Sequence, residues 1–225
     1  MSFYVTGDTH GHNDIAKLTS GRFPDGKTLT KDDYVLICGD VAAVWDNSNG
    51  DRYYRKWFDA KPWTTLYVDG NHEGHDLLDK MPISEYHGGK VHQVSDSVYH
   101  LMRGQVYEFD GRTIFTMGGA SSHDKEWRKE SVSWWAREMP SKTEYQEALD
   151  NLAFHDNQVD YVFTHCASSK LQKKIEDWYE TDELTGFLKM IEGVKFKHWY
   201  FGHYHIDKEI DKKHTAVFNR VIKLW

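Results

Sequence analysis

Short apolar runs in this sequence end repeatedly in residues that can bind metal ions. The first run is followed by Asp8 and His10, and the second by Asp40. In an extended strand, residues i and i+2 point to the same face, so Asp8 and His10 can reach one neighbourhood. Glycines stand before these residues and permit tight turns that carry the backbone close to a site. The pattern predicts a polar site at the ends of strands.

The same pattern recurs further along the chain, where more donors follow later apolar runs. The collected set contains two carboxylates, one amide and four imidazoles: Asp8, Asp40, Asn71, His10, His165, His203 and His205. Mixed oxygen and imidazole ligands suit Mn²⁺, Fe or Zn²⁺ rather than Ca²⁺. So many donors exceed one tetrahedral site and fit two ions that share a bridging carboxylate. We expect two divalent transition-metal ions, Mn²⁺ first and Fe or Zn²⁺ as alternatives, a device suited to displacement at phosphorus.

The elements that must position these donors are short buried strands. Six β-branched or aromatic runs have the length and composition of such strands: residues 3–6, 34–38, 65–68, 113–117, 161–164 and 198–201. A capping box at Ser141 and Glu144 predicts a helix that follows it, and an apolar stripe over 184–191 predicts another. Weaker helical patterns cover 13–19, 51–60 and 75–81.

Residues 86–120 alternate between apolar and polar side chains and predict β-hairpins. Alternation over 215–224 predicts one more strand, whereas the charges of 208–213 alternate in sign and indicate a solvated turn. Together these patterns predict an α/β protein with mixed sheets, and no linker or repeat divides the chain, so we expect one domain over 1–225. In such folds, ligands bind beyond the carboxyl ends of the strands.

Composition excludes several classes of function. The 225 residues carry 28 Lys and Arg against 35 Asp and Glu, a net charge of −7, which argues against long nucleic acids or anionic membranes as partners. Aromatic residues make up 15%, which argues against disorder. The two cysteines, Cys38 and Cys166, form no disulfide framework, and no leader or membrane-spanning stretch is evident. We therefore expect a cytoplasmic protein with free thiols.

The ordered motifs resemble those of the calcineurin-like metallophosphoesterase superfamily, from residue 7 to residue 205. They are Asp8-x-His10, Gly39-Asp40, Gly70-Asn71-His72-Glu73, His165 and Gly202-His203-x-His205. The resemblance implies a four-layer αββα sandwich, two mixed β-sheets flanked by helices, and hydrolysis of a small-molecule or protein phosphoester by a metal-bridging hydroxide.

The resemblance also implies how the ligands divide. A first metal would be held by Asp8, His10 and His205, a second by Asn71, His165 and His203, and Asp40 would bridge both. By the same likeness, His72 binds no metal and instead contacts the phosphate or protonates the leaving oxygen. Asp40 and His72 are thus the residues expected to act in catalysis.

Marks of three branches of the superfamily are missing. The protein phosphatase and diadenosine tetraphosphatase branches have an Arg soon after the Gly-Asp motif, but here none occurs between Asp40 and Arg52. The Tyr of purple acid phosphatases is absent from 41–44. Arg128 is the candidate for a cation that binds substrate phosphate. The alternative is a surface Arg paired with Glu126 or Glu130.

Other readings stay open at this stage. Any one of the histidines alone could be a satisfied core residue, and adjacent Trp134 and Trp135 could form a platform for a ring or simply split between core and surface. The same fold could serve as a nuclease or a cyclic-nucleotide phosphodiesterase, and the Trp-rich segment favours this alternative. A metal-stabilised binding scaffold without turnover is the third alternative. The oligomeric state is open.

Overall fold

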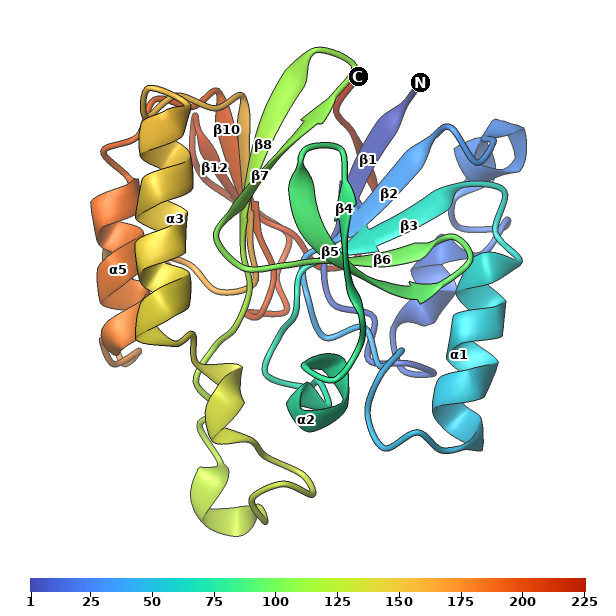
Figure 1. Ribbon diagram of the computed structural model, residues 1–225, viewed down its shortest axis with the longest axis horizontal. Helices are drawn as coiled ribbons and strands as arrows, with labels where there is room; N and C mark the ends of the chain where they lie inside the picture. The colour runs from blue at the N-terminus through green and yellow to red at the C-terminus, as the bar shows by residue number, and fades with distance from the viewer.

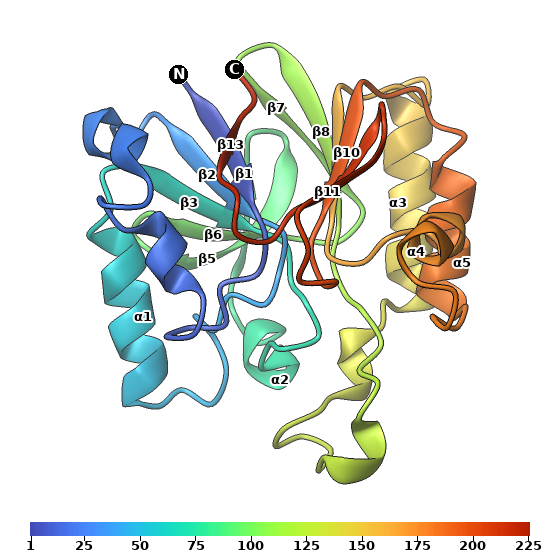
Figure 2. The same cartoon turned by 180° about the vertical axis from the view of Figure 1, so that it is seen from behind.

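Two mixed β-sheets pack face to face in the computed structural model, which describes residues 1–225 (Figure 1). Helices α3 (Lys142–Phe154) and α5 (Glu183–Ile191) cover the outer side of one sheet, and α1 (Asn49–Asp59) covers the other. Figure 2 shows the same layers from behind, with both termini at one end of the sheets. The predicted αββα sandwich is confirmed.

The first sheet has seven strands. In spatial order they are β13 (Ile222–Lys223), β1 (Phe3–Thr6), β2 (Tyr34–Ile37), β3 (Thr64–Tyr67), β6 (Val98–Leu101), β5 (Gly89–Ser95) and β4 (Ile83–Tyr86). Strands β1, β2, β3 and β6 are parallel, and antiparallel strands flank them. The parallel centre brings the carboxyl ends of β1, β2 and β3 to one edge.

The second sheet has six strands. In spatial order they are β11 (Lys208–Asp211), β12 (His214–Ala216), β10 (His198–Phe201), β9 (Tyr161–Thr164), β8 (Arg112–Met117) and β7 (Gln105–Phe109). Its four central strands are parallel. All six strands predicted from apolar runs are present, and the hairpins predicted over 86–120 are confirmed as β5–β6 and β7–β8.

Three apolar cores hold the four layers together. Phe3 and Leu36 of one sheet meet Phe109 and Phe163 of the other in the core between the sheets. A second core joins the first sheet to α1 through buried Phe58. A third joins the second sheet to α3 and α5. Because burial of apolar area drives folding, these three cores fix the sheets that position the strand-end loops.

The helices begin where their caps predict. Ser141 accepts a hydrogen bond from the Glu144 N–H and forms the predicted capping box at α3, and Asp182 forms another at α5. Helix α1 covers the predicted 51–60, while 75–81 contains only the short α2 (His75–Leu78) and 13–19 only the 3₁₀ turn Ile15–Leu18. Helix α4 (Ser169–Ile175) was not predicted. No helix is long and apolar enough to cross a membrane.

Two predictions near the carboxyl end were wrong, the second only in part. Residues 215–224 form no single strand, because the chain leaves β12 in one sheet and enters β13 in the other. The Asp207 carboxylate accepts three consecutive backbone N–H groups, from Phe218, Asn219 and Arg220, and so fixes the bend between them. Of the turn predicted over 208–213, only residues 212–213 form a turn, because residues 208–211 form edge strand β11, which pairs with β12. Charged side chains are typical of such edges.

Candidate metal centre

The strand-end loops of both sheets meet at one place. Side chains that follow β1, β2, β3, β9 and β10 form three overlapping groups, and within each group the ligand atoms lie within 4.8 Å of one another. The groups are Asp8, His10 and His205; His10, Asp40 and His72; and Asp8, Asp40 and His165. The structure thus brings together residues up to 197 positions apart in the chain, which local sequence patterns alone did not guarantee.

Asp40 lies at the centre of this cluster. Its Oδ2 atom is 3.3 Å from His10 Nε2 and 3.5 Å from His165 Nε2. Its Oδ1 atom accepts the His72 backbone N–H at 2.7 Å. Asp40 therefore faces donors from both sheets and fixes the backbone of His72 at the same time.

Asp8 makes the matching contacts on the other side. Its Oδ2 atom is 3.3 Å from His205 Nε2, and the carboxylate accepts the His203 backbone N–H at 3.1 Å. The only basic side chains within 4.0 Å of either carboxylate are imidazoles. Both Asp8 and Asp40 are almost completely buried. Buried carboxylates without Lys or Arg partners fit a cation, because buried charge requires compensation.

Outer hydrogen bonds fix which nitrogen of two histidines faces the cluster. His10 Nδ1 is 2.9 Å from the Asp14 carboxylate, and His165 Nδ1 is 2.6 Å from the Cys38 carbonyl oxygen. Since an oxygen of either kind only accepts, each Nδ1 donates a proton. Each Nε2 is thereby left to face Asp40. This is the arrangement of metal-binding histidines, whose second nitrogen donates to a carboxylate or carbonyl.

Asn71, His165 and His203 lie together on the side of the second sheet. The Asn71 Oδ1 atom is 3.1 Å from His165 Nε2, and the rings of His165 and His203 are 5.0 Å apart. Burial lowers the pKa of His203 to about 3, with the charge of His165 adding to the effect. His203 is therefore neutral near pH 7, as a metal ligand must be.

Asp40 and His165 favour each other's charged forms. Burial alone would raise the pKa of Asp40, but His165 and His10 hold it well below its ordinary value. Burial likewise opposes charge on His165, yet Asp40 raises the pKa of that imidazole to about 10. A cation at His165 Nε2 therefore competes with a proton, and its binding releases that proton.

Four of the eleven non-glycine residues with a positive φ angle are donors of this cluster. His10, Asp40, His203 and His205 have φ angles of 40°, 53°, 68° and 50°, in the left-handed region that non-glycine residues rarely adopt. Such strain costs free energy and is found chiefly at functional sites. Gly39 has a φ of 98°, and a Cβ atom there would lie 2.2 Å from His165 Nδ1. The close approach of these loops requires glycine at this position.

Arg128 borders the site, as its candidacy for phosphate binding requires. Its two terminal nitrogens lie 3.5 and 3.4 Å from the ring nitrogens of His72, and its Nε donates to Asp124 at 2.7 Å. As the alternative expected, Arg128 pairs with a nearby acidic residue, but the partner is Asp124 and not Glu126 or Glu130. Burial lowers the pKa of His72 although Asp40 opposes this, and Arg128 lowers it further.

Two aromatic residues near the site take different places. Trp135 is buried, with its ring 4.9 Å from that of Trp45, whereas Trp134 is half-buried. The reading in which the pair splits between core and surface fits this placement better than a joint platform. Trp45 lies against His72, with ring centroids 6.4 Å apart. Trp45 thus flanks the His72 ring, and Trp135 packs against Trp45.

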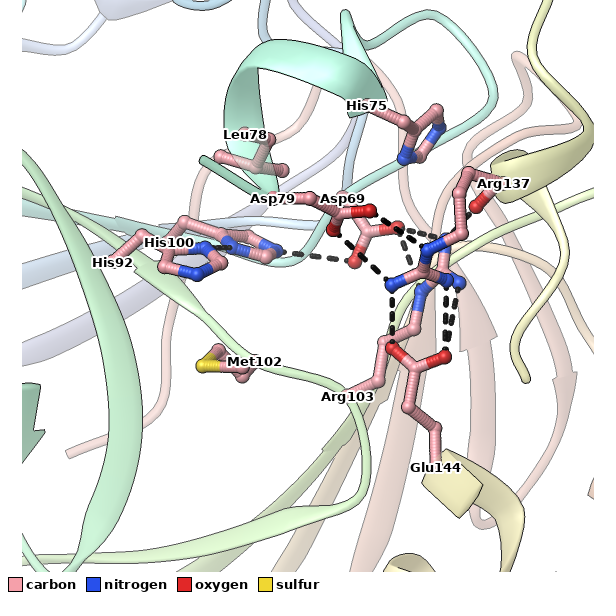
Figure 3. Close-up of a pocket in the computed structure, with 10 residues that line it drawn as sticks. All are labelled: Asp69, His75, Leu78, Asp79, His92, His100, Met102, Arg103, Arg137 and Glu144. Atoms are coloured by element: carbon pink, nitrogen blue, oxygen red, sulfur yellow. Dashed lines mark hydrogen bonds and ion pairs between the residues drawn. The ribbon is translucent and has the colours of Figure 1, made fainter. Parts of the chain in front are cut away.

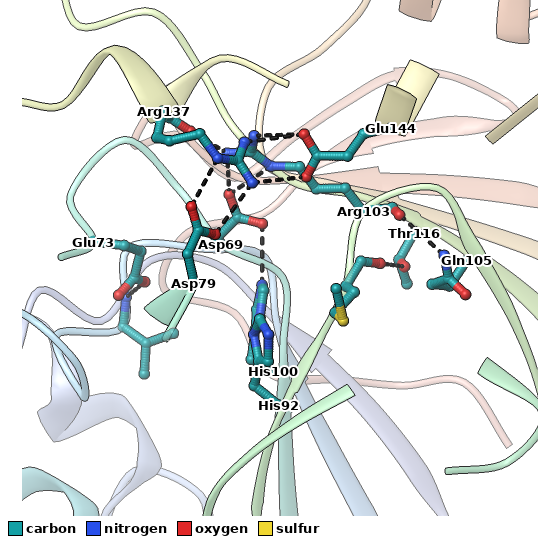
Figure 4. Close-up of polar contacts among 12 residues, drawn as sticks. Asp69, Glu73, Asp79, His92, His100, Arg103, Gln105, Thr116, Arg137 and Glu144 are labelled. Carbon is teal, nitrogen blue, oxygen red and sulfur yellow. Dashed lines mark hydrogen bonds and ion pairs between the residues drawn. The ribbon is translucent and has the colours of Figure 1, made fainter. Parts of the chain in front are cut away.

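A buried ion cluster surrounds Asp69, two residues before Asn71 in the sequence (Figure 3). Asp69, two residues after the end of β3, accepts two hydrogen bonds from Arg103 at 2.9 and 2.5 Å and faces His100 Nε2 at 3.1 Å. Figure 4 shows how Arg137 and Glu144 extend the network. Burial would raise the pKa of Asp69, but Arg103 and His100 hold it well below its ordinary value.

Sequence reasoning missed the residues that support the donors. Asp14 offered one signal, since it stands four residues after His10, although the residues between them form turns and not a helix. Arg103, Ser122 and Glu138 had none. They reach the site from loops and turns whose positions depend on the whole fold.

Over 141 residues, the chain is 29% identical to lariat debranching enzyme A of Xenopus laevis, which aligns 55% of this chain with 24% of that protein. The chain thus spans about a quarter of the length of this curated relative.

Two solved structures are also similar. One is a protein of unknown function from Aquifex aeolicus, with a TM-score of 0.34, 17% identity, and coverage of 73% of this chain and 80% of that one. The other is the sulfate thiohydrolase SoxB of Thermus thermophilus, with a TM-score of 0.44, 12% identity, and coverage of 97% and 51%. Both scores are below 0.5, so neither likeness bears on function.

A sequence model of the calcineurin-like phosphoesterases matches residues 1–207, which include every residue of the cluster described above. Members of this family hydrolyse phosphoesters with divalent metal ions, and the buried carboxylates and imidazoles of the cluster fit such ions. The chain belongs to the calcineurin-like phosphoesterase family.

Proposed function

We propose that this chain hydrolyses phosphoesters with two divalent ions held side by side, Mn²⁺ being the first candidate and Fe or Zn²⁺ the alternatives. In this proposal Asp8, His10 and His205 hold one ion, Asn71, His165 and His203 hold the other, and Asp40 bridges them. The observation that carries it is the position of Asp40, whose Oδ2 atom lies 3.3 Å from His10 Nε2 of the first ligand set and 3.5 Å from His165 Nε2 of the second. One carboxylate that faces donors of both sheets is what a bridging ligand requires.

When bound, such ions would supply positive charge that polarises a phosphate oxygen and lowers the pKa of a water molecule toward neutrality. The residues of the chain supply orientation. Asp14 and the Cys38 carbonyl hold two imidazoles with Nε2 inward, and Asp40 holds the backbone of His72. Preorganised groups of this kind lower the barrier because they need no rearrangement during the reaction.

His72 and Arg128 form the side of the site that faces substrate in this proposal. Burial and the nearby guanidinium lower the pKa of His72, so near pH 7 its imidazole is neutral and donates a single N–H. That N–H suits a phosphate oxygen or the leaving oxygen. Arg128 adds a planar fork that matches two phosphate oxygens. Its fixed contact with Asp124 holds the fork in place.

The test uses purified protein supplied with Mn²⁺ and paired aryl phosphate monoesters and diesters. We expect turnover, a large loss of kcat in His72→Ala with metal content retained, and a raised KM in Arg128→Met. The exposed His12 is the matched control, since it lies outside the donor groups and His12→Ala removes the same ring. Full activity of His72→Ala would contradict its role.

A second candidate, hydrolysis of phosphodiesters, is favoured by the likeness to a lariat debranching enzyme. The net charge of −7 makes a short or cyclic nucleotide a better substrate than a long nucleic acid. Turnover of the aryl diester but not the monoester would support this candidate, and assays on cyclic nucleotides and single-stranded DNA would follow. Two bound ions without turnover of any ester would instead indicate a binding scaffold.

The remaining expectations are part of the same proposal. We propose that residues 1–225 act as one domain, and that the partner is a small-molecule or protein phosphoester rather than a membrane. Cys38 and Cys166 are both buried free thiols, which supports a reducing, cytoplasmic setting.

A further inference from the structure

Asn71 is held by a short chain of buried hydrogen bonds that leads away from the metal centre. Its Nδ2 atom donates to Ser122 Oγ at 3.2 Å, and Ser122 Oγ donates to Glu138 Oε2 at 2.7 Å. Asn71, Ser122 and Glu138 are 4%, 5% and 0% exposed. No solvent contact therefore competes with the direction of these bonds.

The Glu138 carboxylate, at the end of this series of hydrogen bonds, determines their direction. Glu138 Oε1 accepts the Ser122 backbone N–H at 2.7 Å and lies 3.3 Å from Lys125 Nζ. An ionised carboxylate only accepts, so the single hydroxyl proton of Ser122 must point at Glu138. Ser122 Oγ is then left to accept, and Asn71 must turn its NH₂ group toward it.

We propose that Ser122 and Glu138 are positioning residues that set the orientation of the Asn71 amide, so that its carbonyl oxygen faces the second metal position. The inference rests on the proposed function, because it assumes an ion beside His165 and His203. It explains why an acidic side chain is fully buried next to a site that already holds two carboxylates. An amide turned the other way would present N–H groups, which cannot bind a cation.

The isosteric change Glu138→Gln tests the polarity of the chain of bonds. The Gln amide would donate to Ser122 Oγ and free the hydroxyl proton to point at Asn71, which then turns its carbonyl oxygen away from the metal position. We expect the affinity for the second Mn²⁺ to fall by about 10–100-fold, as for other residues that orient ligands. Binding at Asp8, His10 and His205 should not change.

A second substitution separates polarity from mere packing. Asn71→Asp alone places a carboxylate oxygen against the accepting Ser122 oxygen and should weaken the second ion. In the double variant with Glu138→Gln, the freed Ser122 proton can donate to the new carboxylate, and we expect the second ion to bind more tightly than in Asn71→Asp. A structural role for Glu138 predicts no such rescue. Lys125→Met is the control, because it removes the ion pair but leaves the chain of bonds intact.

The readouts are calorimetric Mn²⁺ titration and the electron paramagnetic resonance signal of exchange-coupled Mn²⁺ pairs, with circular dichroism to verify folding. If Glu138→Gln folds poorly, Ser122→Ala tests the same series of hydrogen bonds without changing Glu138. Wild-type affinity for both ions in Glu138→Gln, an equal loss in Lys125→Met, or a double variant no better than Asn71→Asp would each overturn the inference. A wild-type protein that binds only one ion would overturn the proposed function as well.

Discussion

The buried ion pair between Asp69 and Arg103 gives the sharpest prediction about stability. The two side chains are 1% and 3% exposed, and Asp69 stands directly before the loop that carries Asn71 and His72. In Arg103→Met, the Asp69 carboxylate keeps only the His100 contact. The carbonyl oxygens of Arg137 and Glu138 also lose their donor, Arg103 Nη2.

The expected cost follows from these contacts. Removing one partner of a buried ion pair typically costs about 3–5 kcal/mol, because the other charge stays buried and uncompensated. The lost hydrogen bonds to the two carbonyl groups belong to the same network, so they do not add as separate terms. For a chain of this size, the loss corresponds to a fall in Tm of roughly 6–20 °C.

Urea unfolding at pH 7, at unchanged m-value, measures this difference. Arg112→Met is the matched control, since Arg112 pairs with Asp110 at 3.2 Å on the surface and should lose about 1 kcal/mol or less. Because the pKa of Asp69 is depressed in the folded state, its contribution is present above pH ~4 and is lost as the pH falls further. The variant should therefore approach wild type in acid. A cost at pH 7 no larger than that of the control would refute the reasoning.

Three further predictions concern pH, metal and backbone. Burial, with Arg103 adding to it, lowers the pKa of His75 to about 3. The contribution of its neutral imidazole to the free energy of unfolding is therefore fully present above pH ~6.5 and falls toward pH 3 by up to about 1.4 kcal/mol per pH unit. His75→Phe should flatten that slope in urea unfolding, and an unchanged slope would contradict the assignment. Chelation should lower Tm, because free Mn²⁺ at 100 times Kd contributes about 2.7 kcal/mol per site; an identical Tm with and without chelator speaks against bound metal. Gly39→Ala places a Cβ atom against His165 and should weaken metal binding far more than Gly111→Ala, where φ is also positive but no atom lies within 4 Å of the added Cβ. Equal effects of the two substitutions would mean that Gly39 matters only for its positive φ angle.

Elements with local signals were predictable from the sequence. Helix α3 begins directly after its cap Ser141 because the cap and the apolar stripe agree, and β9 and β10 are short apolar runs bounded by polar residues. The stretch after β12 defeated the same reasoning. Its alternation continues across the bend that Asp207 fixes through three backbone N–H groups, and that contact joins residues at least 11 positions apart.

The candidate site likewise contains residues that the sequence could predict and residues that it could not. The strand-end donors were predictable because each follows an apolar run, and parallel strands bring those ends to one edge. Arg128 was predictable only as a candidate, since its contact with His72 depends on how the loop after β8 returns to the site. Glu138 and Arg103 carried no signal, because burial of a charged residue is decided by partners that are distant in the sequence.

The central claim is that two ions act together in hydrolysis. The most direct measurement titrates metal-free protein with Mn²⁺ and follows, in the same samples, bound metal and the rate of aryl phosphate diester and monoester hydrolysis. The account predicts that the rate rises with occupancy of the second ion and reaches its limit near two ions per chain. Full activity at one ion per chain, or no bound metal after titration, would contradict it.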